Sequence, residues 1–313
     1  MDERLHPPTW KTLLAFGIIY FVWGSTFLFI RVGVREVPPL LLAAIRFFVA
    51  GAVLYGWTRA RGERAPKGRE WLAVTILAFM IFVVDYGLLF WAEQRVASGI
   101  AAVILATIPV FMTLSEILVL RTQKLTARLG IGLLIGIAGV GVLMSRSLDL
   151  GGVPIDRVGA LALIVAAMSW SVASVLTRKL PLPAAKTTSS GAQMLVGGVL
   201  LTIAAGAFGE LRGFDPSRVS WGAWEALAYL IVAGSIVGYT AYVWLIHHES
   251  PTKVGTYAYV NPLVAVVLGY FFGGEGLGLR TMAGTICVLL SVIVITTAPA
   301  KRTVVPVAAE DAA

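Results

Sequence analysis

Long apolar segments alternate with short polar connectors along almost the whole chain. Each segment has about 20 residues, which is enough to cross about 30 Å of hydrocarbon as an α-helix. Because lipid offers no hydrogen-bond partner to an open backbone, helices are favoured over open strands. The pattern therefore predicts an all-α membrane protein with ten transmembrane helices. The predicted spans are residues 13–33, 39–57, 71–92, 98–120, 127–145, 158–178, 188–208, 223–246, 253–272 and 281–298.

Two sets of five spans carry the same residue types at matching places. The segment WGSTFLFIR from Trp23 aligns with WSVASVLTR from Trp170, and the same offset of 147 residues continues through the next span. A further shift of six residues aligns three more pairs, Tyr86 with Tyr239, Trp91 with Trp244 and Pro109 with Pro262. An odd number of spans per copy places the second copy upside down in the membrane. The sequence therefore predicts two inverted five-helix repeats, residues 13–146 and 157–298.

Lysine and arginine are unevenly divided between the two alternating sets of connectors. The set that includes both ends of the chain holds 16 of these residues, and the other set holds 8. Because basic residues favour the cytoplasmic face, both termini are predicted to be cytoplasmic, with residues 1–12 as the leading segment. Residues 299–313 are rich in small residues, which predicts a disordered cytoplasmic tail.

Composition excludes several classes of function. Of the 313 residues, 58% are hydrophobic and 13% are charged, which is too little polar surface for a soluble globule. The net charge of +8 arises mainly in connectors, where it sets orientation, so no nucleic-acid binding is predicted. Cys287 is the only cysteine and the three histidines do not cluster, so neither a metal site nor a cofactor is predicted. The chain has no phosphate-binding glycine loop and no catalytic constellation, which argues against ATP drive and against an enzyme.

Two opposite charges are expected well inside the predicted spans. A charge at the bilayer centre costs about 2.5 to 3.5 kcal/mol or more, so each needs a partner or a function. Arg46 and Asp85 lie at matching depths, about 10 Å from the outer face. The second repeat has Gln193 and Gly238 at these places, so both charges are missing together. We therefore expect a structural ion pair; the alternative is that Asp85 exchanges a coupling proton or binds a substrate ammonium group.

Glu116 is a third charged residue within a predicted span, about four residues from its cytoplasmic end. At that depth a carboxylate reaches interfacial water or a loop residue, which is the simpler expectation. The alternative is a gate on the cytoplasmic side in which Glu116 pairs with Lys124 or Arg128.

Prolines and aromatic residues indicate where a substrate would bind. Pro109 and Pro262 fall at equivalent midpoints of two spans, and each removes a backbone hydrogen bond. Paired helix breaks favour a binding site, with a packing kink as the equal alternative. Polar and aromatic side chains in corresponding spans would line the site, or else pack in the core. The candidate substrate-binding residues are Trp23, Ser25, Tyr86, Trp170, Tyr239, Tyr257 and Asn261.

Four segments give the chain a family resemblance. They are WGSTF (Trp23 to Phe27) followed by Arg31, VPPLLLAAIRF (Val37 to Phe47), YGLLFWAEQRVASGIAAVI (Tyr86 to Ile104) and NPLVAVVLGYFFGGE (Asn261 to Glu275). The chain resembles the drug/metabolite transporter superfamily, and within it the EamA-type ten-helix exporters. The resemblance implies an inner-membrane carrier for amino acids, other metabolites or toxic organic compounds. It also implies a central cavity formed mainly by the first, third, fourth, sixth, eighth and ninth spans.

These observations predict a multi-pass secondary transporter of a bacterial-type inner membrane. We expect export of small amphipathic metabolites, foremost neutral or aromatic amino acids, by alternating access, with protons as a candidate coupling ion. The alternatives are a broad-specificity drug/metabolite exporter of the same fold, or a channel or membrane scaffold. Gly132, Gly136 and Gly139 form a small face that predicts close helix packing within a monomer or a homodimer contact.

Overall fold

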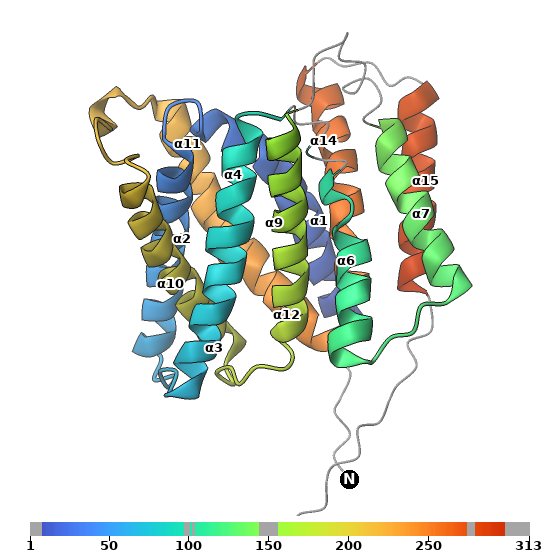
Figure 1. Ribbon diagram of the computed structural model, residues 1–313, viewed down its shortest axis with the longest axis horizontal. Helices are drawn as coiled ribbons and strands as arrows, with labels where there is room; N and C mark the ends of the chain where they lie inside the picture. Colours follow the sequence, from blue (N-terminus) through green and yellow to red (C-terminus); the bar gives the residue numbers. More distant parts are fainter. Residues whose placement is uncertain (1–7, 97–100, 102–103, 144–155, 274–278, 298–313) are drawn as a thin grey trace, which may run out of the picture.

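The computed structural model describes residues 8–96, 101, 104–143, 156–273 and 279–297. Within these ranges the chain is helical and contains no β-strand. The helices stand side by side in one bundle (Figure 1). In chain order the elements are α1 (Thr9–Gly33), α2 (Pro39–Ala60), α3 (Arg69–Ala78), η1 (Phe79–Tyr86), α4 (Gly87–Glu93), α6 (Ile108–Ser115), η2 (Glu116–Leu120), α7 (Ala127–Leu143), α9 (Arg157–Leu176), α10 (Lys186–Ala207), η3 (Pro216–Arg218), α11 (Trp221–Tyr229), η4 (Leu230–Tyr239), α12 (Thr240–His248), α13 (Pro251–Val254), α14 (Tyr257–Gly273) and α15 (Leu279–Thr296).

Helix length and apolarity confirm a multi-span membrane protein. Within the described residues, six continuous helical stretches are long and apolar enough to cross a bilayer. They are Thr9–Gly33, Pro39–Ala60, Arg69–Glu93, Arg157–Leu176, Lys186–Ala207 and Trp221–His248. They coincide with six of the predicted spans. The other four predicted spans contain shorter helices in the described part of the chain, so the total of ten stays a prediction.

Two of the long stretches contain a π-helical segment near their middle. The segment η1 ends at Tyr86 and η4 ends at Tyr239, which are the two tyrosines that the repeat aligns. In both stretches the chain then returns to an α-helix, α4 and α12 respectively. Because π-helical turns occur frequently at functional sites, the two segments favour a functional site in the middle of the bundle.

The helices α2 and α10 cross very closely at glycine residues. A Cβ atom added at Gly51 of α2 would lie 2.6 Å from the Cα of Leu195 on α10. A Cβ added at Gly198 of α10 would lie 2.5 Å from the Cα of Phe48 on α2. The two contacts are reciprocal, because Leu195 and Gly198 are the residues 147 positions after Phe48 and Gly51. Small residues at the crossing let the two backbones approach each other.

A second close pair, α7 with α15, lies at the opposite edge of the bundle from α2 and α10 (Figure 1). A Cβ at Gly139 would lie 2.9 Å from the backbone nitrogen of Val288, and one at Gly136 would lie 2.5 Å from the Ser291 hydroxyl. The small face of α7 is therefore covered by α15 of the same chain. Of the two roles expected for this face, packing within the bundle is the one that the structure has.

Large apolar side chains cover the outside of the bundle. Leu13, Phe21 and Leu134 expose 66%, 58% and 69% of their surface. In water so much exposed apolar surface would favour aggregation, whereas lipid chains solvate it. The buried interior, by contrast, contains polar and charged side chains, among them Arg46 and Glu116. The interior of the bundle is therefore where a function is to be sought.

Candidate functional site

Side chains from four helices meet in the middle of the bundle as a packed group of rings. The ring centroid of Trp23 on α1 lies 4.9 Å from that of Tyr257 on α14 and 5.0 Å from that of Tyr242 on α12. It lies 5.5 Å from the centroid of Trp170 on α9, the residue that the repeat aligns with Trp23. All four side chains are buried. Helices from the two halves of the chain thus meet at this point.

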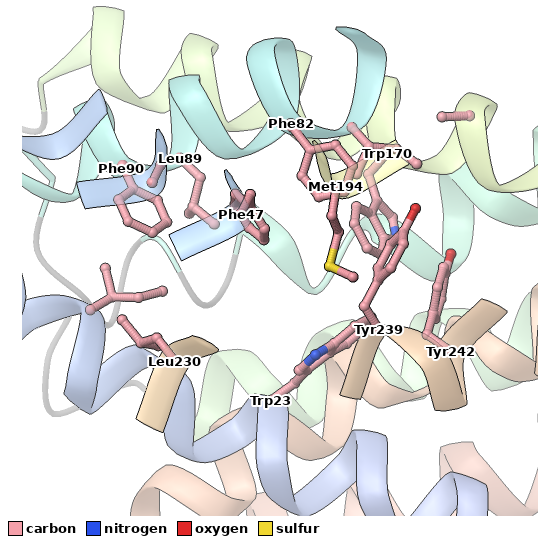
Figure 2. Close-up of a cluster of buried hydrophobic side chains, with 14 of the residues drawn as sticks. Trp23, Phe47, Phe82, Leu89, Phe90, Trp170, Met194, Leu230, Tyr239 and Tyr242 are labelled. Carbon is pink, nitrogen blue, oxygen red and sulfur yellow. The ribbon is translucent and has the colours of Figure 1, made fainter. Parts of the chain in front are cut away.

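The group of rings continues toward α2. The centroid of Tyr86 lies 6.0 Å from that of Trp170 and 4.7 Å from that of Phe47. The centroid of Phe82 lies 4.6 Å from that of Phe47 and 5.5 Å from that of Tyr239. Figure 2 shows six of these side chains in place. We define the central aromatic cluster as Trp23, Phe47, Phe82, Tyr86, Trp170, Tyr239, Tyr242 and Tyr257.

Hydrogen bonds fix the orientation of some of these rings. The indole nitrogen of Trp23 donates to the carbonyl of Gly234 at 3.1 Å, and the Tyr239 hydroxyl donates to Oε1 of Gln193 at 2.8 Å. The indole nitrogen of Trp170 is different, because it is buried without a hydrogen-bond partner. The cluster therefore holds one unused donor in the midst of its rings.

Sequence reasoning placed five members of the cluster and missed Phe47, Phe82 and Tyr242. A signal was present for two of the three. Tyr242 follows Tyr239 by three residues and Phe82 precedes Tyr86 by four, so each lies on the same helix face as a predicted residue. Phe47 adjoins Arg46 in sequence, and only the packing of α2 against η1 brings its ring into the cluster.

Arg46 does not form the predicted ion pair with Asp85. Its Nε donates to the Ser235 hydroxyl at 2.8 Å, and its guanidinium carbon lies 4.7 Å from the ring centroid of Phe47 and 5.3 Å from that of Tyr86. The physical reason is the direction of the side chains. Asp85 and Tyr86 are adjacent residues of η1, so their side chains leave the helix in different directions, and it is Tyr86 that faces Arg46.

Asp85 is buried in the same segment, η1, as Tyr86. Its carboxylate is 5% exposed and lies within electrostatic range of the phenol groups of Tyr242 and Tyr257. Among the described residues, no basic side chain forms an ion pair with it. The middle of the bundle therefore holds a guanidinium group and a carboxyl group that are both buried and that, in the described part of the chain, do not pair with each other.

Ser25 is not part of the cluster. Its hydroxyl lies 2.6 Å from the Tyr229 hydroxyl on α11 and donates to the carbonyl of Val22 at 2.7 Å. Residues two apart on a helix point about 200° apart, so Ser25 faces away from the side on which Trp23 meets the other rings. The expectation that Ser25 lines the same site as Trp23 is therefore wrong for this structure.

The two prolines occupy different local structures. Pro109 lies in the first turn of α6, directly after turn residues 106–107, so the helix is interrupted as expected. Pro262 lies inside α14, which continues on both sides of it, so the expected break is absent there. The turn of that span comes earlier, at residues 255–256 between α13 and α14. Beside Pro262, the buried Asn261 leaves its Oδ1 without a hydrogen-bond partner.

Glu116 is buried rather than solvated. Its carboxylate is 2% exposed and accepts hydrogen bonds from Thr252 of α13, from the hydroxyl at 2.8 Å and from the backbone nitrogen at 3.2 Å. It also accepts from the Thr122 hydroxyl at 3.1 Å. The expected contact with a loop residue is present at Thr122, although the shortest contact is with Thr252, 136 residues away in sequence. The alternative, a pair with Lys124 or Arg128, does not occur among the described residues.

A further link lies close to the Glu116 contact. The Tyr20 hydroxyl of α1 lies 2.7 Å from the Thr256 hydroxyl, just before α14. At the other end of the bundle, Glu36 accepts hydrogen bonds from the backbone nitrogen and hydroxyl of Ser220 at 2.6 and 2.7 Å. The two halves of the chain are thus joined by polar contacts at both ends, above and below the aromatic cluster.

The chain matches a known family in both halves. Residues 9–145 and 157–297 each match the EamA-like transporter family. A relative described as the uncharacterized inner membrane transporter YedA of Escherichia coli K12 is 36% identical over 295 residues, covering 92% of this chain and 93% of the relative. An uncharacterized transporter of Archaeoglobus fulgidus is 26% identical and covers 91% of this chain and 97% of its own length. Protein PecM of Dickeya dadantii is 26% identical, with 88% of each chain covered.

One solved protein structure has the same fold. Its TM-score with this chain is 0.75 at 20% sequence identity. The similarity covers 91% of this chain and 96% of the other, so it extends over essentially the whole bundle.

Proposed function

The chain belongs to the EamA-like transporter family of the drug/metabolite transporter superfamily, and we propose that it exports neutral or aromatic amino acids by alternating access. That it is a multi-pass membrane transporter follows from the family and from the apolar spans. The observation that carries the amino acid proposal is the central aromatic cluster with Arg46 and Asp85 beside it. Rings suit an apolar or aromatic side chain, and the two buried charges suit a small polar group.

The two halves are inverted repeats in this proposal, residues 13–146 and 157–298. Support comes from the family match in each half and from the reciprocal contacts of Gly51 and Gly198 at the crossing of α2 and α10. The contact between the aligned rings of Trp23 and Trp170 agrees with a two-fold axis through the cluster. Inverted repeats commonly enclose a substrate site near the bilayer midplane, which is where the cluster would lie.

Alternating access would proceed by breaking the polar contacts at one end while keeping those at the other. With both termini in the cytoplasm, the contacts of Glu116 with Thr252 and of Tyr20 with Thr256 form the inner set. The contact of Glu36 with Ser220 belongs to the outer set. Each contact joins the first half of the chain to the second, so rocking one half against the other would open one set at a time. The rings of the cluster touch one another in this structure, and they would separate to admit a substrate.

The membrane and the coupling ion complete the proposal. We place the protein in a bacterial-type inner membrane, as the printed name of the Escherichia coli relative states for that protein. Asp85 is the proposed site of proton exchange, since its carboxyl group is buried and forms no ion pair with a basic side chain of the described residues. A broad-specificity exporter of organic cations is the second candidate, because aromatic faces and an unpaired carboxylate also suit a cation.

Counterflow in liposomes tests the proposal. The purified protein is reconstituted, and uptake of labelled phenylalanine, threonine and a cationic dye is measured with and without a pH gradient. Saturable counterflow of an amino acid supports the amino acid carrier, whereas movement of the dye alone supports the cation exporter. Flux that neither saturates nor shows counterflow would identify a channel and contradict the carrier proposal.

A further inference from the structure

Arg46 carries a buried charge that the fold does not neutralise. The side chain is 1% exposed, and in the described part of the chain no carboxylate pairs with it. Its Nε donates to the Ser235 hydroxyl, but its buried Nη1 has no hydrogen-bond partner among the residues that the structure describes. A buried cation with an unused donor is costly, and in a membrane protein such a group usually has a function.

The second half of the chain shows what the fold itself requires at this place. The equivalent residue, Gln193, donates from Nε2 to the Ser189 hydroxyl at 2.9 Å and accepts from the Tyr239 hydroxyl. Both ends of this amide are therefore satisfied without a charge. Arg46 also lies against the aligned residue, Tyr86, with its guanidinium carbon 5.3 Å from the ring centroid, but a guanidinium group only donates and cannot accept from a phenol as Gln193 does. A neutral amide is thus sufficient for packing at this position, and the charge of Arg46 is additional to it.

Unused hydrogen-bond acceptors lie around the same group of rings. Asp85 adjoins Tyr86 in the chain and makes no ion pair among the described residues. The Tyr86 phenol lies within electrostatic range of both Asp85 and Arg46. Asn261, one helical turn after Tyr257 of the cluster, leaves its buried Oδ1 unpaired. Among the described residues, the aromatic cluster is therefore flanked by an unused cationic donor, by an unused amide acceptor and by a carboxyl group that makes no ion pair.

We propose that Arg46 and Asp85 are the two poles of one zwitterion site. The guanidinium of Arg46 binds the carboxylate of an amino acid through its free Nη1, and Asp85 receives the ammonium group. The aromatic cluster accepts the side chain of the substrate. A zwitterion neutralises both buried charges at once, which a cation or an anion alone cannot do. This inference rests on the proposed amino acid transport and specifies how the substrate is recognised.

Three ligands that differ by one charged group provide the test. L-phenylalanine carries both groups, phenethylamine lacks the carboxylate, and 3-phenylpropionate lacks the ammonium group. Binding is measured on the purified protein in detergent by titration calorimetry, so that the result does not depend on turnover. The wild type should bind phenylalanine about 10- to 100-fold more tightly than either analogue, the usual range for one hydrogen-bonded charge.

Two variants test which side chain binds the carboxylate of the substrate and which binds its ammonium group. Arg46→Gln copies the residue of the second repeat and should weaken binding of phenylalanine and 3-phenylpropionate about 10- to 100-fold, with phenethylamine changed less than about 3-fold. Asp85→Asn should weaken the binding of phenylalanine and of phenethylamine and leave the binding of 3-phenylpropionate unchanged. Arg46→Lys and Asp85→Glu keep the charges, and each should retain the ligand ranking of the wild type. Elution of each variant at the wild-type position in gel filtration controls for folding.

The outcomes separate this inference from the function on which it rests. If the wild type moves only the cationic dye in liposomes, the amino acid proposal fails and the zwitterion site fails with it. If the wild type moves phenylalanine yet binds phenethylamine equally well, the transport proposal stands and the role of Arg46 is refuted. That comparison needs no variant, so it decides the question even if Arg46→Gln does not fold. If Arg46→Gln loses the same amount of affinity for all three ligands, this would likewise refute recognition of the substrate carboxylate by Arg46.

Discussion

The close crossing of α2 and α10 makes a sharp prediction about Gly51. A Cβ at this position would lie 2.6 Å from the Cα of Leu195, about 0.8 Å inside the 3.4 Å at which ordinary contact begins. The obstacle is backbone, so no side-chain rotation can relieve it. We therefore expect Gly51→Ala to force the two helices apart.

The cost follows from the overlap. Overpacking a buried contact destabilises by about 1–3 kcal/mol. The gain in helix propensity from glycine to alanine offsets at most about 1 kcal/mol of this. Gly51→Ala should therefore lower stability, although alanine is the better helix former. Gly198 meets the same crossing from the other side, so the double variant with Gly198→Ala should cost less than the sum of the two single changes, because the first separation partly relieves the second contact.

The assay is thermal unfolding of the purified protein in detergent, followed by the loss of the monodisperse species in gel filtration. The matched control is Gly56→Ala on the same helix, where an added Cβ meets nothing within 4 Å. This control should leave the midpoint unchanged or raise it, while Gly51→Ala lowers it. A midpoint for Gly51→Ala at or above that of Gly56→Ala would refute the close crossing of the two helices.

Three further predictions concern the ends and the middle of the bundle. Glu116→Gln replaces one acceptor oxygen of the carboxylate by an amide donor, which would face the donors of Thr252. It should reduce the free energy of unfolding by about 1–3 kcal/mol and so lower the unfolding midpoint. An unchanged midpoint would contradict the buried contact. Hydrogen bonds from Ser220 lower the pKa of Glu36. The contact therefore stabilises the folded protein at pH values above the ordinary carboxyl pKa, and this stabilisation is lost as the pH falls through the lowered pKa. When the pH is lowered from about 6 to about 3, the unfolding midpoint of Ser220→Ala should therefore decrease less than that of the wild type. An equal decrease in both proteins would contradict the contact between Glu36 and Ser220. Asp85→Asn should abolish uphill transport driven by a pH gradient and, because the ammonium group loses its partner, should also weaken counterflow of phenylalanine; full pH-driven transport in this variant would exclude Asp85 as the coupling group.

Predictions that depended on local pattern agreed with the structure. Six spans are confirmed because the length and apolarity of a segment decide whether it crosses a membrane. Two of the aligned pairs, Trp23 with Trp170 and Tyr86 with Tyr239, lie in one cluster because residues at equivalent depths come close where the two halves meet. The family also was readable from motifs such as WGSTF, and the family match confirms it.

Predictions about partners were wrong where they rested on depth or on neighbours in the sequence. Arg46 and Asp85 were paired because they lie at the same depth, but depth says nothing about the direction in which a side chain leaves its helix. Glu116 does accept a hydrogen bond from Thr122 of the neighbouring loop, but its shortest contact is with the distant Thr252, which the sequence did not indicate. Ser25 was placed with Trp23 although two residues along a helix reverse the direction of the side chain.

The sequence by itself determined the membrane-spanning architecture, the family and the kinds of residue in the middle of the bundle. These properties follow from the length of the apolar segments, the distribution of charge and the aligned motifs, all of which can be identified from the order of the residues alone. Only the tertiary structure decided that Arg46 and Asp85 remain unpaired and that Glu116 is buried. The rotation of each helix about its axis is set by how it packs against its neighbours, and the close glycine crossing of α2 and α10 shows how tightly such packing constrains it.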